Sequence, residues 1–447
     1  MMAVPGSRES EKLSMQRFPG YGLYLLLAVY TICFLDRQVI NILAEPIKKD
    51  LGLSDAQLGL LTGLSFALFY TALGIPIARL SESRNRSSII VACLAIWSSF
   101  TMLCSLAGNM TWLLVTRIGV GFGEAGCFPA SQSIISEYLP PTRRAWSLSI
   151  LMMGAPLGLL LGMMIGGIVA GRYGWRGAFV AAGAPGLLLA VLVRFFLPDP
   201  SRTGHRVTPV PPPSFGTTVG GLARRAGFRP LIIGMSLAAF VTYAQNAFVA
   251  SFFLRVYSTD LAGFTQNRSA VGYIGVALGL ILGLGGAVGL LFGGYLGDRL
   301  GRGNMRGYLT VASLASVLAA PVFLCVFGVR SLSLALALLL PATILSNVWA
   351  GPAYAVLQGM AHERSRATAA AIAVLFLTLI GLGLGPLSVG ALSDHLARSL
   401  GTAEGLRWAL MATAGMSVLS ATAFWLSRVQ MRPGLEPVTA PQTSPNS

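Results

Sequence analysis

Two opposite charges, Asp36 and Arg37, stand side by side inside the apolar stretch YGLYLLLAVYTICFLDRQVINIL, which covers residues 21–43. A carboxylate that is partly removed from water can exchange a proton near neutral pH. Arginine stays charged and can hold an anion through two parallel hydrogen bonds. The pair therefore offers proton exchange and anion binding at one point of the chain.

A second pair of charges, Arg117 and Glu124, interrupts another apolar stretch. Seven residues correspond to about two helical turns, so the two side chains lie on one face of their helix. We interpret Asp36 and Glu124 as proton-coupling residues and Arg37 and Arg117 as a charge cluster for the substrate. A purely structural cluster of ion pairs is the alternative, because an unpaired charge at the centre of a bilayer costs at least about 2.5–3.5 kcal/mol.

The composition of the chain is that of an integral membrane protein. Of its 447 residues, 54% are hydrophobic and 11% are charged, whereas soluble globular domains carry about 25% charged residues. The formal net charge of +16 does not indicate nucleic-acid binding, because the basic residues stand singly or in pairs between apolar runs. The composition therefore predicts a lipid bilayer as partner and no nucleic acid.

The apolar runs that must position the charges are long enough to cross a bilayer, which takes about 20 residues. We predict twelve transmembrane helices, at residues 20–43, 56–79, 87–108, 111–136, 146–171, 177–197, 229–256, 271–297, 306–328, 332–358, 367–393 and 406–428. They form an N-terminal half at 20–197 and a C-terminal half at 229–428. Residues 1–19 are predicted to be a cytoplasmic leader, 198–228 a cytoplasmic linker and 429–447 a disordered cytoplasmic tail.

Basic residues predict the orientation. Of the 32 Lys and Arg residues, 21 fall on the side of the two termini and nine on the other side, and cytoplasmic loops carry the excess of such residues. We expect a multi-pass protein of the inner (plasma) membrane with both termini in the cytoplasm. At 1.5 Å per residue, Asp36 and Arg37 then lie roughly 24 Å from the cytoplasmic end, and Arg117 and Glu124 roughly 9 and 20 Å below the outer surface. Asp36, Arg37 and Arg117 therefore share a depth, and Glu124 lies nearer the middle of the bilayer.

The two halves repeat each other. Five residues recur 223 positions later in corresponding helices: Pro129, Ala130, Arg143, Gly158 and Gly162 correspond to Pro352, Ala353, Arg366, Gly381 and Gly385. Duplication of a six-helix unit is an architecture of transporters. The expected fold is thus an all-α membrane protein with two pseudo-symmetric six-helix halves.

The chain resembles the major facilitator superfamily over nearly its whole length. The loop GGYLGDRLGRG matches the loop signature of that family through Asp298, Arg299 and Arg302, and the first-half loop ARLSESRNR matches through Glu82 and Arg86. Ser83 departs from the arginine usual there. The resemblance implies that these residues form a cytoplasmic gate motif. It also implies that the first and fourth spans line a central cavity, where their four charged groups can form a neutral cluster that faces water. The fifth span, GLLLGMMIGG, is similar to the glycine signature of antiporters, with Met163 in place of the usual proline, and close helix packing explains the same glycines.

A narrower resemblance links FLDRQ in the first span and TRIGVGFGEAGCFPAS in the fourth to the spinster-type branch. It implies proton-coupled export of an amphipathic lipid-like substrate, of the lysophospholipid or sphingoid phosphate class, by alternating access. The second half supports this interpretation, because its mid-depth polar residues are uncharged. We expect a cavity wall that includes Thr242, Tyr243, Gln245, Asn246, Asn347 and Trp349.

Other functions remain open or are disfavoured. Within transport, the alternative is an antiporter or symporter of a water-soluble drug or organic anion. A non-transporting membrane receptor or sensor on the same fold is an alternative of another class. We find no nucleotide-binding loop, catalytic triad or metal-ligand spacing, so no enzyme, cofactor or metal is expected. The five cysteines are interpreted as reduced packing residues, and the protein is expected to be a monomer.

Overall fold

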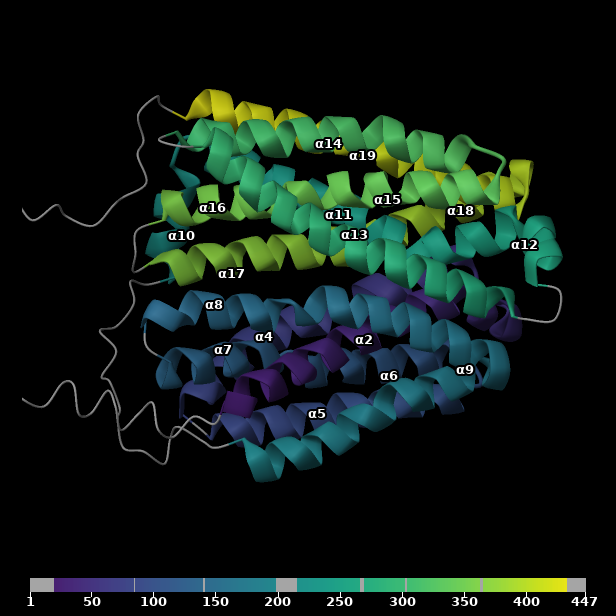
Figure 1. Ribbon diagram of the computed structural model, residues 1–447, viewed down its shortest axis with the longest axis horizontal. Coiled ribbons are helices and arrows are strands. Elements are labelled where there is room, and N and C mark those ends of the chain that lie inside the picture. The colour runs from purple at the N-terminus through teal and green to yellow at the C-terminus, as the bar shows by residue number, and fades with distance from the viewer. Residues whose placement is uncertain are drawn as a thin grey trace, which may run out of the picture. The chain divides into compact units, whose positions relative to one another are not determined.

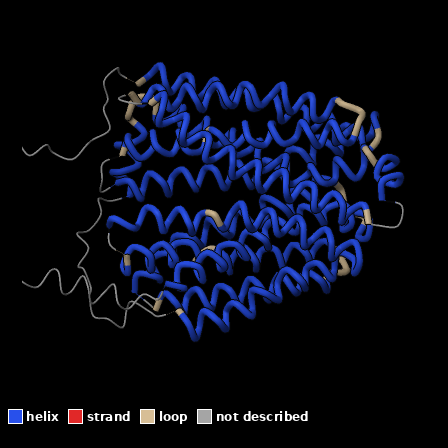
Figure 2. Tube along the Cα trace, in the orientation of Figure 1, coloured by secondary structure: helices blue, strands red, loops and turns tan. Residues whose placement is uncertain are grey.

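The protein is helical throughout the part that the structure describes. The computed structural model describes residues 20–83, 85–139, 141–197, 215–265, 269–301, 304–361 and 365–431, and each regular element in these ranges is a helix (Figure 2). Helices satisfy their backbone hydrogen bonds internally, which is a requirement in lipid. The predicted all-α class is confirmed. The predicted leader, most of the tail and residues 198–214 of the linker lie outside the described residues.

The chain packs into two compact units (Figure 1). One contains the described residues of Met1–Thr208 together with Ala247–Leu284, and the other contains those of Pro209–Asn246 and Gly285–Ser447. This division does not follow the boundary predicted at 198–228, because a stretch from the beginning of the second half packs with the first. The six-helix halves read from the sequence stay a prediction.

The helical elements of the first half differ widely in length. In order they are α2 (Gly20–Leu51), α3 (Asp55–Gly59), η1 (Leu60–Leu64), α4 (Ser65–Ser83), α5 (Arg86–Leu103), η2 (Cys104–Leu106), α6 (Met110–Glu124), α7 (Cys127–Tyr138), α8 (Pro141–Met152) and α9 (Gly154–Phe196). The π-helix η1 continues into α4 without a break, and such π segments often occur at functional sites.

The second half repeats this succession of long helices. Its elements are α10 (Phe215–Ala223), α11 (Phe228–Val256), α12 (Ser258–Thr265), α13 (Ala270–Leu300), α14 (Met305–Gly328), α15 (Leu332–Val348), α16 (Ala350–Met360), α17 (Arg366–Phe376), η5 (Leu377–Leu384), α18 (Gly385–Leu400) and α19 (Thr402–Gln430). Helices α14 and α19 run side by side (Figure 1). The second π-helix, η5, contains Gly381, the counterpart of Gly158 in the repeat.

Ten helical runs in the described chain are long and apolar enough to cross a membrane, against the twelve predicted spans. The two counts differ at two places. The predicted fourth span is divided into α6 and α7, each too short alone, and the fifth and sixth spans form one run, Trp146–Phe196. Gly174 breaks that run with φ of 73°, a left-handed conformation that favours glycine. A division inside the fourth span, and a kink at Gly174 in place of a loop between the fifth and sixth spans, therefore account for the difference.

The glycines of the fifth span serve helix packing. A Cβ atom at Gly158 would come within 2.5 Å of the Thr31 carbonyl oxygen, and one at Gly162 within 2.8 Å of the Leu35 oxygen. Small residues at such positions let two backbones approach closely. Through these contacts α9 packs against the face of α2 next to Asp36 and Arg37. The packing therefore positions these charges.

Gly162→Ala is therefore expected to destabilise the protein by about 1–3 kcal/mol, because the new methyl group meets backbone that cannot move aside. The thermal unfolding midpoint in detergent measures this effect. Gly108→Ala is the matched control, since a Cβ there has no atom within 4 Å. Equal melting of the two variants would show that α2 and α9 do not depend on close approach.

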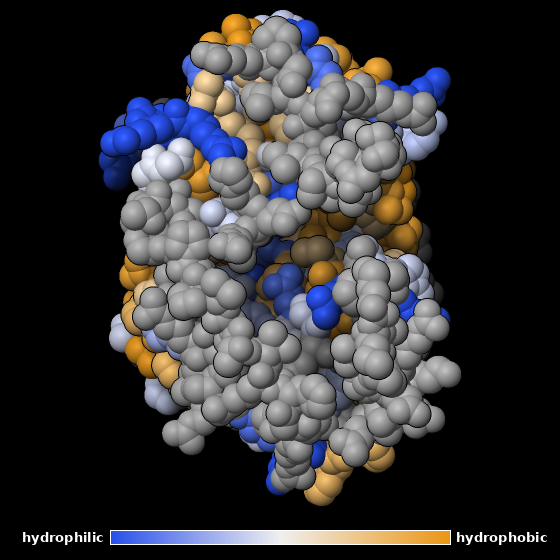
Figure 3. Space-filling view, turned by 90° about the vertical axis from the view of Figure 1, so that its left-hand side faces the viewer, coloured by the Kyte–Doolittle hydropathy of each residue, from blue (hydrophilic) through white to orange (hydrophobic). Residues whose placement is uncertain are grey.

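Hydrophobic side chains reach the surface at many points. Figure 3 looks onto the ends of the helices, and the described hydrophobic residues visible there lie mainly along the edges of the face. Leu188, Phe195 and Leu291 are 64%, 77% and 75% exposed. Large exposed apolar areas mark membrane contact in proteins, so this surface is that of a protein embedded in lipid.

Candidate functional site

The closest contact among the predicted charges joins Arg37 to Glu124. Arg37 on α2 donates from Nε to Oε2 of Glu124, the last residue of α6, at 2.5 Å. The Glu124 side chain is buried, whereas 15% of the Arg37 side chain is exposed. The pair therefore connects a buried carboxylate to a guanidinium that solvent or a ligand can reach.

Three aromatic rings surround the Arg37 guanidinium. Its Cζ atom lies 5.1 Å from the ring centroid of Phe34, 4.7 Å from that of Phe66 and 4.6 Å from that of Tyr70. Cation–π contacts at these distances stabilise a charge by about 0.5–2 kcal/mol each, depending on desolvation. The rings hold Arg37 in place by an interaction that does not require an ionised Glu124.

Cys33 also contacts the carboxylate. Its Sγ donates to the same Glu124 Oε2 at 3.3 Å. The predicted role of this cysteine as a packing residue is therefore incomplete, because the thiol helps to orient Glu124. The spacing along the helix could have predicted that Cys33 and Phe34 lie beside Arg37. They precede it by four and three residues and thus share its face.

Asp36 turns away from its neighbour. It is fully buried and accepts a hydrogen bond from Thr101 Oγ1 of α5 at 3.1 Å, while its Oδ1 has no hydrogen-bond partner among the described residues. Successive residues of a helix point about 100° apart. Asp36 and Arg37 therefore contact two different parts of the molecule.

Arg117 lies close enough to Asp36 for their charges to attract each other. It is 1% exposed, and its Nε and Nη1 have no hydrogen-bond partner within the described ranges. An unpaired charge would be costly in this setting, so the two opposite charges compensate each other. Arg117 is not accessible to a ligand in this structure.

The four groups lie near one another but do not face water as one cluster, and the ion pair seen among them in the described chain joins Arg37 to Glu124. Asp36, Arg117 and Glu124 are buried among helices, and Arg37 alone of the four is partly exposed. The expectation of a cluster facing water was wrong for the other three. The reason is that α6 approaches its neighbours very closely and excludes solvent.

Glycines of the stretch RIGVGFGEAG permit this approach. A Cβ at Gly123 would lie 2.6 Å from the Trp97 nitrogen of α5, and one at Gly121 would lie 3.1 Å from the Phe66 oxygen of α4. The helix then breaks at Ala125 and Gly126, directly after Glu124. The glycine pattern accordingly packs the helix that carries Arg117 and Glu124 closely against α4 and α5.

Two of the polar residues predicted for the second half form hydrogen bonds within their own helices. Thr242 donates to the Ala238 oxygen at 3.0 Å, and Asn347 donates to the Thr343 oxygen at 2.8 Å. Gln245 is 4% exposed, and its Nε2 has no partner in the described chain. Tyr243 and Asn246 are half-buried on the same helix, α11.

Trp349 differs from the prediction of a cavity residue. It is 7% exposed, belongs to the hydrophobic core of the second unit and stacks on Phe424, with ring centroids 6.1 Å apart. The sequence does not reveal this, because an aromatic residue after an apolar run suits a core and a cavity equally well. A role for the other five residues in binding remains a prediction.

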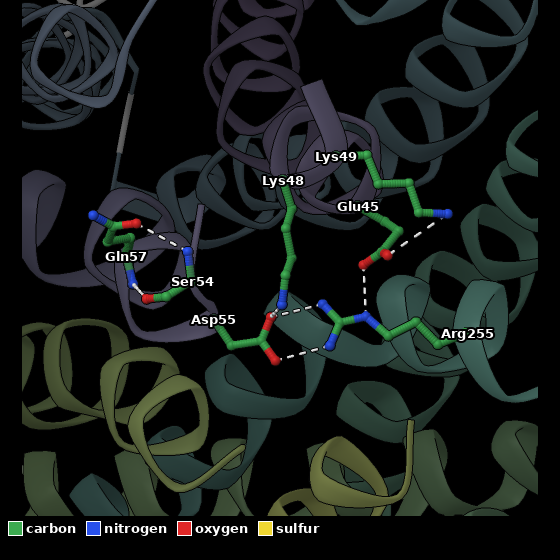
Figure 4. A network of polar contacts seen from close by, with 7 residues as sticks. All are labelled: Glu45, Lys48, Lys49, Ser54, Asp55, Gln57 and Arg255. Carbon is green, nitrogen blue, oxygen red and sulfur yellow. Dashed lines mark hydrogen bonds and ion pairs between the residues drawn. The ribbon is translucent and has the colours of Figure 1, made fainter. Parts of the chain in front are cut away.

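A further group of charges lies where α2 ends (Figure 4). Arg255, near the end of α11, donates to Glu45 Oε2 at 2.7 Å and to both oxygens of Asp55 at 2.8 and 2.7 Å. Lys48 reaches Asp55 Oδ1 at 2.5 Å, and Lys49 lies 3.9 Å from Glu45. No motif in the sequence predicts this group, because its residues belong to separate segments whose proximity appears only in the fold.

Comparison with known proteins decides the family. The model of the Major Facilitator Superfamily matches residues 26–386, which is most of the chain. The chain belongs to the major facilitator superfamily.

Similar members of the superfamily are transport proteins. Over 412 residues the chain is 31% identical to a protein named MFS-type efflux pump from Mycolicibacterium smegmatis, covering 91% of this chain and 92% of that one. Over 292 residues it is 29% identical to a probable sulfoacetate transporter, SauU, from Cupriavidus necator, covering 64% and 66%.

A solved structure supports the narrower resemblance. The bacterial homologue of the human lysosomal transporter Spinster, in an inward-facing and occupied conformation, matches with a TM-score of 0.80 and 31% identity, covering 92% of this chain and 97% of that chain. The spinster-like resemblance of the FLDRQ motif is confirmed. This superfamily member is a multi-pass membrane transporter and not an enzyme.

Part of the predicted gate motif lies among the residues that the structure describes. Asp298, near the end of α13, accepts a hydrogen bond from Tyr308 at 2.9 Å, and Arg299 lies 3.5 Å from the Tyr295 hydroxyl. In the first half, Arg86 begins α5. Arg302 and the side chain of Glu82 lie outside the described residues. The predicted gating role of these residues has not been tested.

Asp298→Asn is expected to shift the transporter away from the outward-open state while leaving it folded, because it removes the negative charge of the motif but keeps its shape. Distance measurements between labels on the cytoplasmic side would detect the shift. Tyr308→Phe is the matched control for loss of the hydrogen bond alone. An unchanged distribution in Asp298→Asn would contradict the gating role.

Proposed function

We propose that this transporter moves an amphipathic, lipid-like substrate of the lysophospholipid or sphingoid phosphate class, coupled to protons, by alternating access of two halves. The observation that carries the proposal is the Arg37–Glu124 pair. A buried acid that can take up a proton is joined there to a partly exposed guanidinium that can hold an anion.

The pair can exchange a proton for an anion. While Glu124 is ionised, it occupies the Nε side of Arg37. Protonation removes the carboxylate charge and weakens this contact, and the guanidinium then becomes available to a phosphate or carboxylate head group. Because Phe34, Phe66 and Tyr70 also hold the cation, Arg37 stays in position when Glu124 becomes neutral.

The second carboxylate supplies a further proton site in this proposal. Asp36 is buried, with one oxygen lacking a hydrogen-bond partner among the described residues and with Arg117 nearby. A carboxylate in such a place can bind a proton, and its protonation would leave the Arg117 charge uncompensated. In this proposal Asp36 couples proton uptake to its hydrogen bond with Thr101 of α5 and to the charge of Arg117 on α6.

The lipid-like class is favoured by the contrast between the repeats. The proposed substrate contacts of the first half include a charged group, whereas those of the second half are Thr242, Tyr243, Gln245 and Asn246, which are uncharged. A head group and an acyl chain suit such unequal surroundings. The spinster-like resemblance supports the same class.

A water-soluble organic anion or drug is the alternative substrate. It is supported by the similar proteins, one named an efflux pump and the other a probable sulfoacetate transporter. The Arg37 guanidinium would suit a sulfonate or carboxylate equally well. A receptor or sensor that does not transport is the alternative of another class, and it would show no flux of either kind of substrate.

The cellular setting belongs to the proposal as well. We place the transporter in the inner (plasma) membrane as a monomer with both termini in the cytoplasm, on the strength of the bias of basic residues. The small-molecule substrate and protons are its partners, together with the lipid bilayer.

Flux measurements in proteoliposomes test the function. A panel of lysolipids and sphingoid phosphates, together with sulfoacetate and other small organic anions, is expected to show flux of the lipid-like compounds that increases with an imposed pH gradient. Flux of small anions alone would favour the alternative substrate. Equal flux with and without the gradient would contradict proton coupling.

A further inference from the structure

The charges in Figure 4 form a built site and not a chance surface contact. Arg255 uses Nε for Glu45 and two further nitrogens for Asp55, at distances of 2.7 to 2.8 Å. The side chains of Arg255, Glu45 and Asp55 are 6%, 7% and 1% exposed. Bidentate pairs that exclude water are among the strong interactions of proteins, whereas exposed pairs contribute little.

The backbone before Asp55 is built to present its carboxylate. Helix α2 ends at Leu51, and Gly52 turns the chain with φ of 64°. Ser54 then caps α3, with its Oγ accepting from the Gln57 nitrogen while the Gln57 side chain accepts from the Ser54 nitrogen. This capping box fixes Asp55 in the first turn of α3, where the helix dipole favours an acid.

The site joins parts of the chain that belong to different repeats. Glu45 and Asp55 lie at the end of the first span and the beginning of the second, whereas Arg255 lies at the end of the first span of the second repeat, 200 residues beyond Asp55. Within the unit that contains residues 247–284, these contacts tie the end of α11 to α2 and α3. By the bias of basic residues, this end lies on the non-cytoplasmic side.

We propose that Glu45, Asp55 and Arg255 are further functional residues of transport and form an outer gate. The gate is intact while the non-cytoplasmic side is closed and broken while that side is open. The inference rests on the alternating-access part of the proposed function and on neither the substrate nor the proton coupling.

The charge balance of the site supports this assignment. With Lys48 on Asp55, two acids meet two bases in the less exposed part of the site, while Lys49, 3.9 Å from Glu45, has a side chain that is 73% exposed to solvent. The gate therefore needs no ion or substrate to close. Breaking it exposes both partners to water, which solvates them. A buried neutral network of this kind has two arrangements, closed and hydrated, which is what a gate requires.

A neighbouring ion pair offers a matched control. Asp50, also near the end of α2, accepts from Arg176 of α9 at 2.7 Å, and Trp175 donates to the same oxygen. Both partners belong to the first repeat, and their side chains are 44% and 45% exposed. Opening between the repeats would not stretch this contact, so its removal leaves the proposed gate intact.

The experiment measures the distance between spin labels at Leu106→Cys and Thr259→Cys, which are exposed at this end on the first and second repeats. A Cys325→Ser background is used, because the other four cysteines are buried. No substrate or pH gradient is added, so the result does not depend on the flux assays. Arg255→Gln is expected to increase the population with the longer distance severalfold, and Asp50→Asn is expected to leave the distribution unchanged.

Two further variants test the geometry of the Arg255 contacts and keep the experiment informative if Arg255→Gln does not fold. Arg255→Lys keeps the charge but loses the planar fork, and an intermediate shift is expected. If Arg255→Gln does not fold, Glu45→Gln, which removes one contact of the three, is measured instead, and a shift toward the longer distance supports the gate. Folded gate variants with the distance distribution of the parent, or an equal shift in Asp50→Asn, would overturn the proposal.

Discussion

Glu124→Gln is expected to abolish the dependence of flux on an imposed pH gradient while substrate binding is retained. Glutamine keeps the shape of the side chain and an oxygen that can accept from Arg37, but it cannot gain or lose a proton. Cys33 and the three rings around Arg37 remain, so the site stays assembled. Gradient-driven uptake and substrate exchange without a gradient, measured in the same proteoliposomes, separate the two properties.

Glu404→Gln is the control for this experiment. Glu404 pairs with Arg407 on α19 at 2.7 Å, and its side chain is 44% exposed. The same chemical change there should alter neither uptake nor exchange. If Glu124→Gln retains gradient-driven transport, the residue is not part of the proton mechanism, and loss of both uptake and exchange would assign it to binding instead.

The two arginines are expected to respond differently to substitution. Arg37→Lys should lose transport severalfold without loss of thermal stability, because lysine keeps the charge beside Glu124 but lacks the planar fork. Arg117→Lys should also insert and fold, since Asp36 keeps an opposite charge nearby. Flux and thermal unfolding, measured for each variant, test the expectation that anion binding belongs to the partly exposed arginine.

Alanine variants complete the comparison. Arg117→Ala is expected to cost about 3–5 kcal/mol of stability, because it leaves the buried Asp36 carboxylate without its opposite charge. Arg37→Ala should cost less, since the Arg37 side chain reaches solvent and water can replace it beside Glu124. If both lysine variants transport like the parent and the alanine variants only unfold, the charges are structural and the proposed role of Asp36 and Arg37 is wrong.

Several features of this transporter could be predicted from the sequence because they depend on local patterns. The length of the apolar runs predicts membrane helices, whereas the orientation indicated by the excess of basic residues stays a prediction. The spacing of Arg117 and Glu124 places both on one face of a helix, and Glu124 indeed pairs with Arg37 of α2. The glycines of the fifth span indicate close packing, which the contacts of Gly158 and Gly162 with α2 bear out.

Other features depend on contacts between distant segments, which no local pattern contains. Asp36 and Arg37 are neighbours in the chain, yet one meets Thr101 and the other meets Glu124. Adjacent helical residues diverge by about 100°, and the partner of each is decided by how closely α5 and α6 approach. Burial of three of the four charges follows from the same close packing.

The sequence by itself determined the class of the molecule, because hydrophobic length and charge bias act on each segment separately in a bilayer. Only the tertiary structure decided the partners of its charges. Arg255 has no motif around it that predicts Glu45 and Asp55, whose segments come within hydrogen-bond distance only after the helices pack. Pairing between buried charges is a property of their geometry, since the strength of the interaction depends on distance and on the exclusion of water.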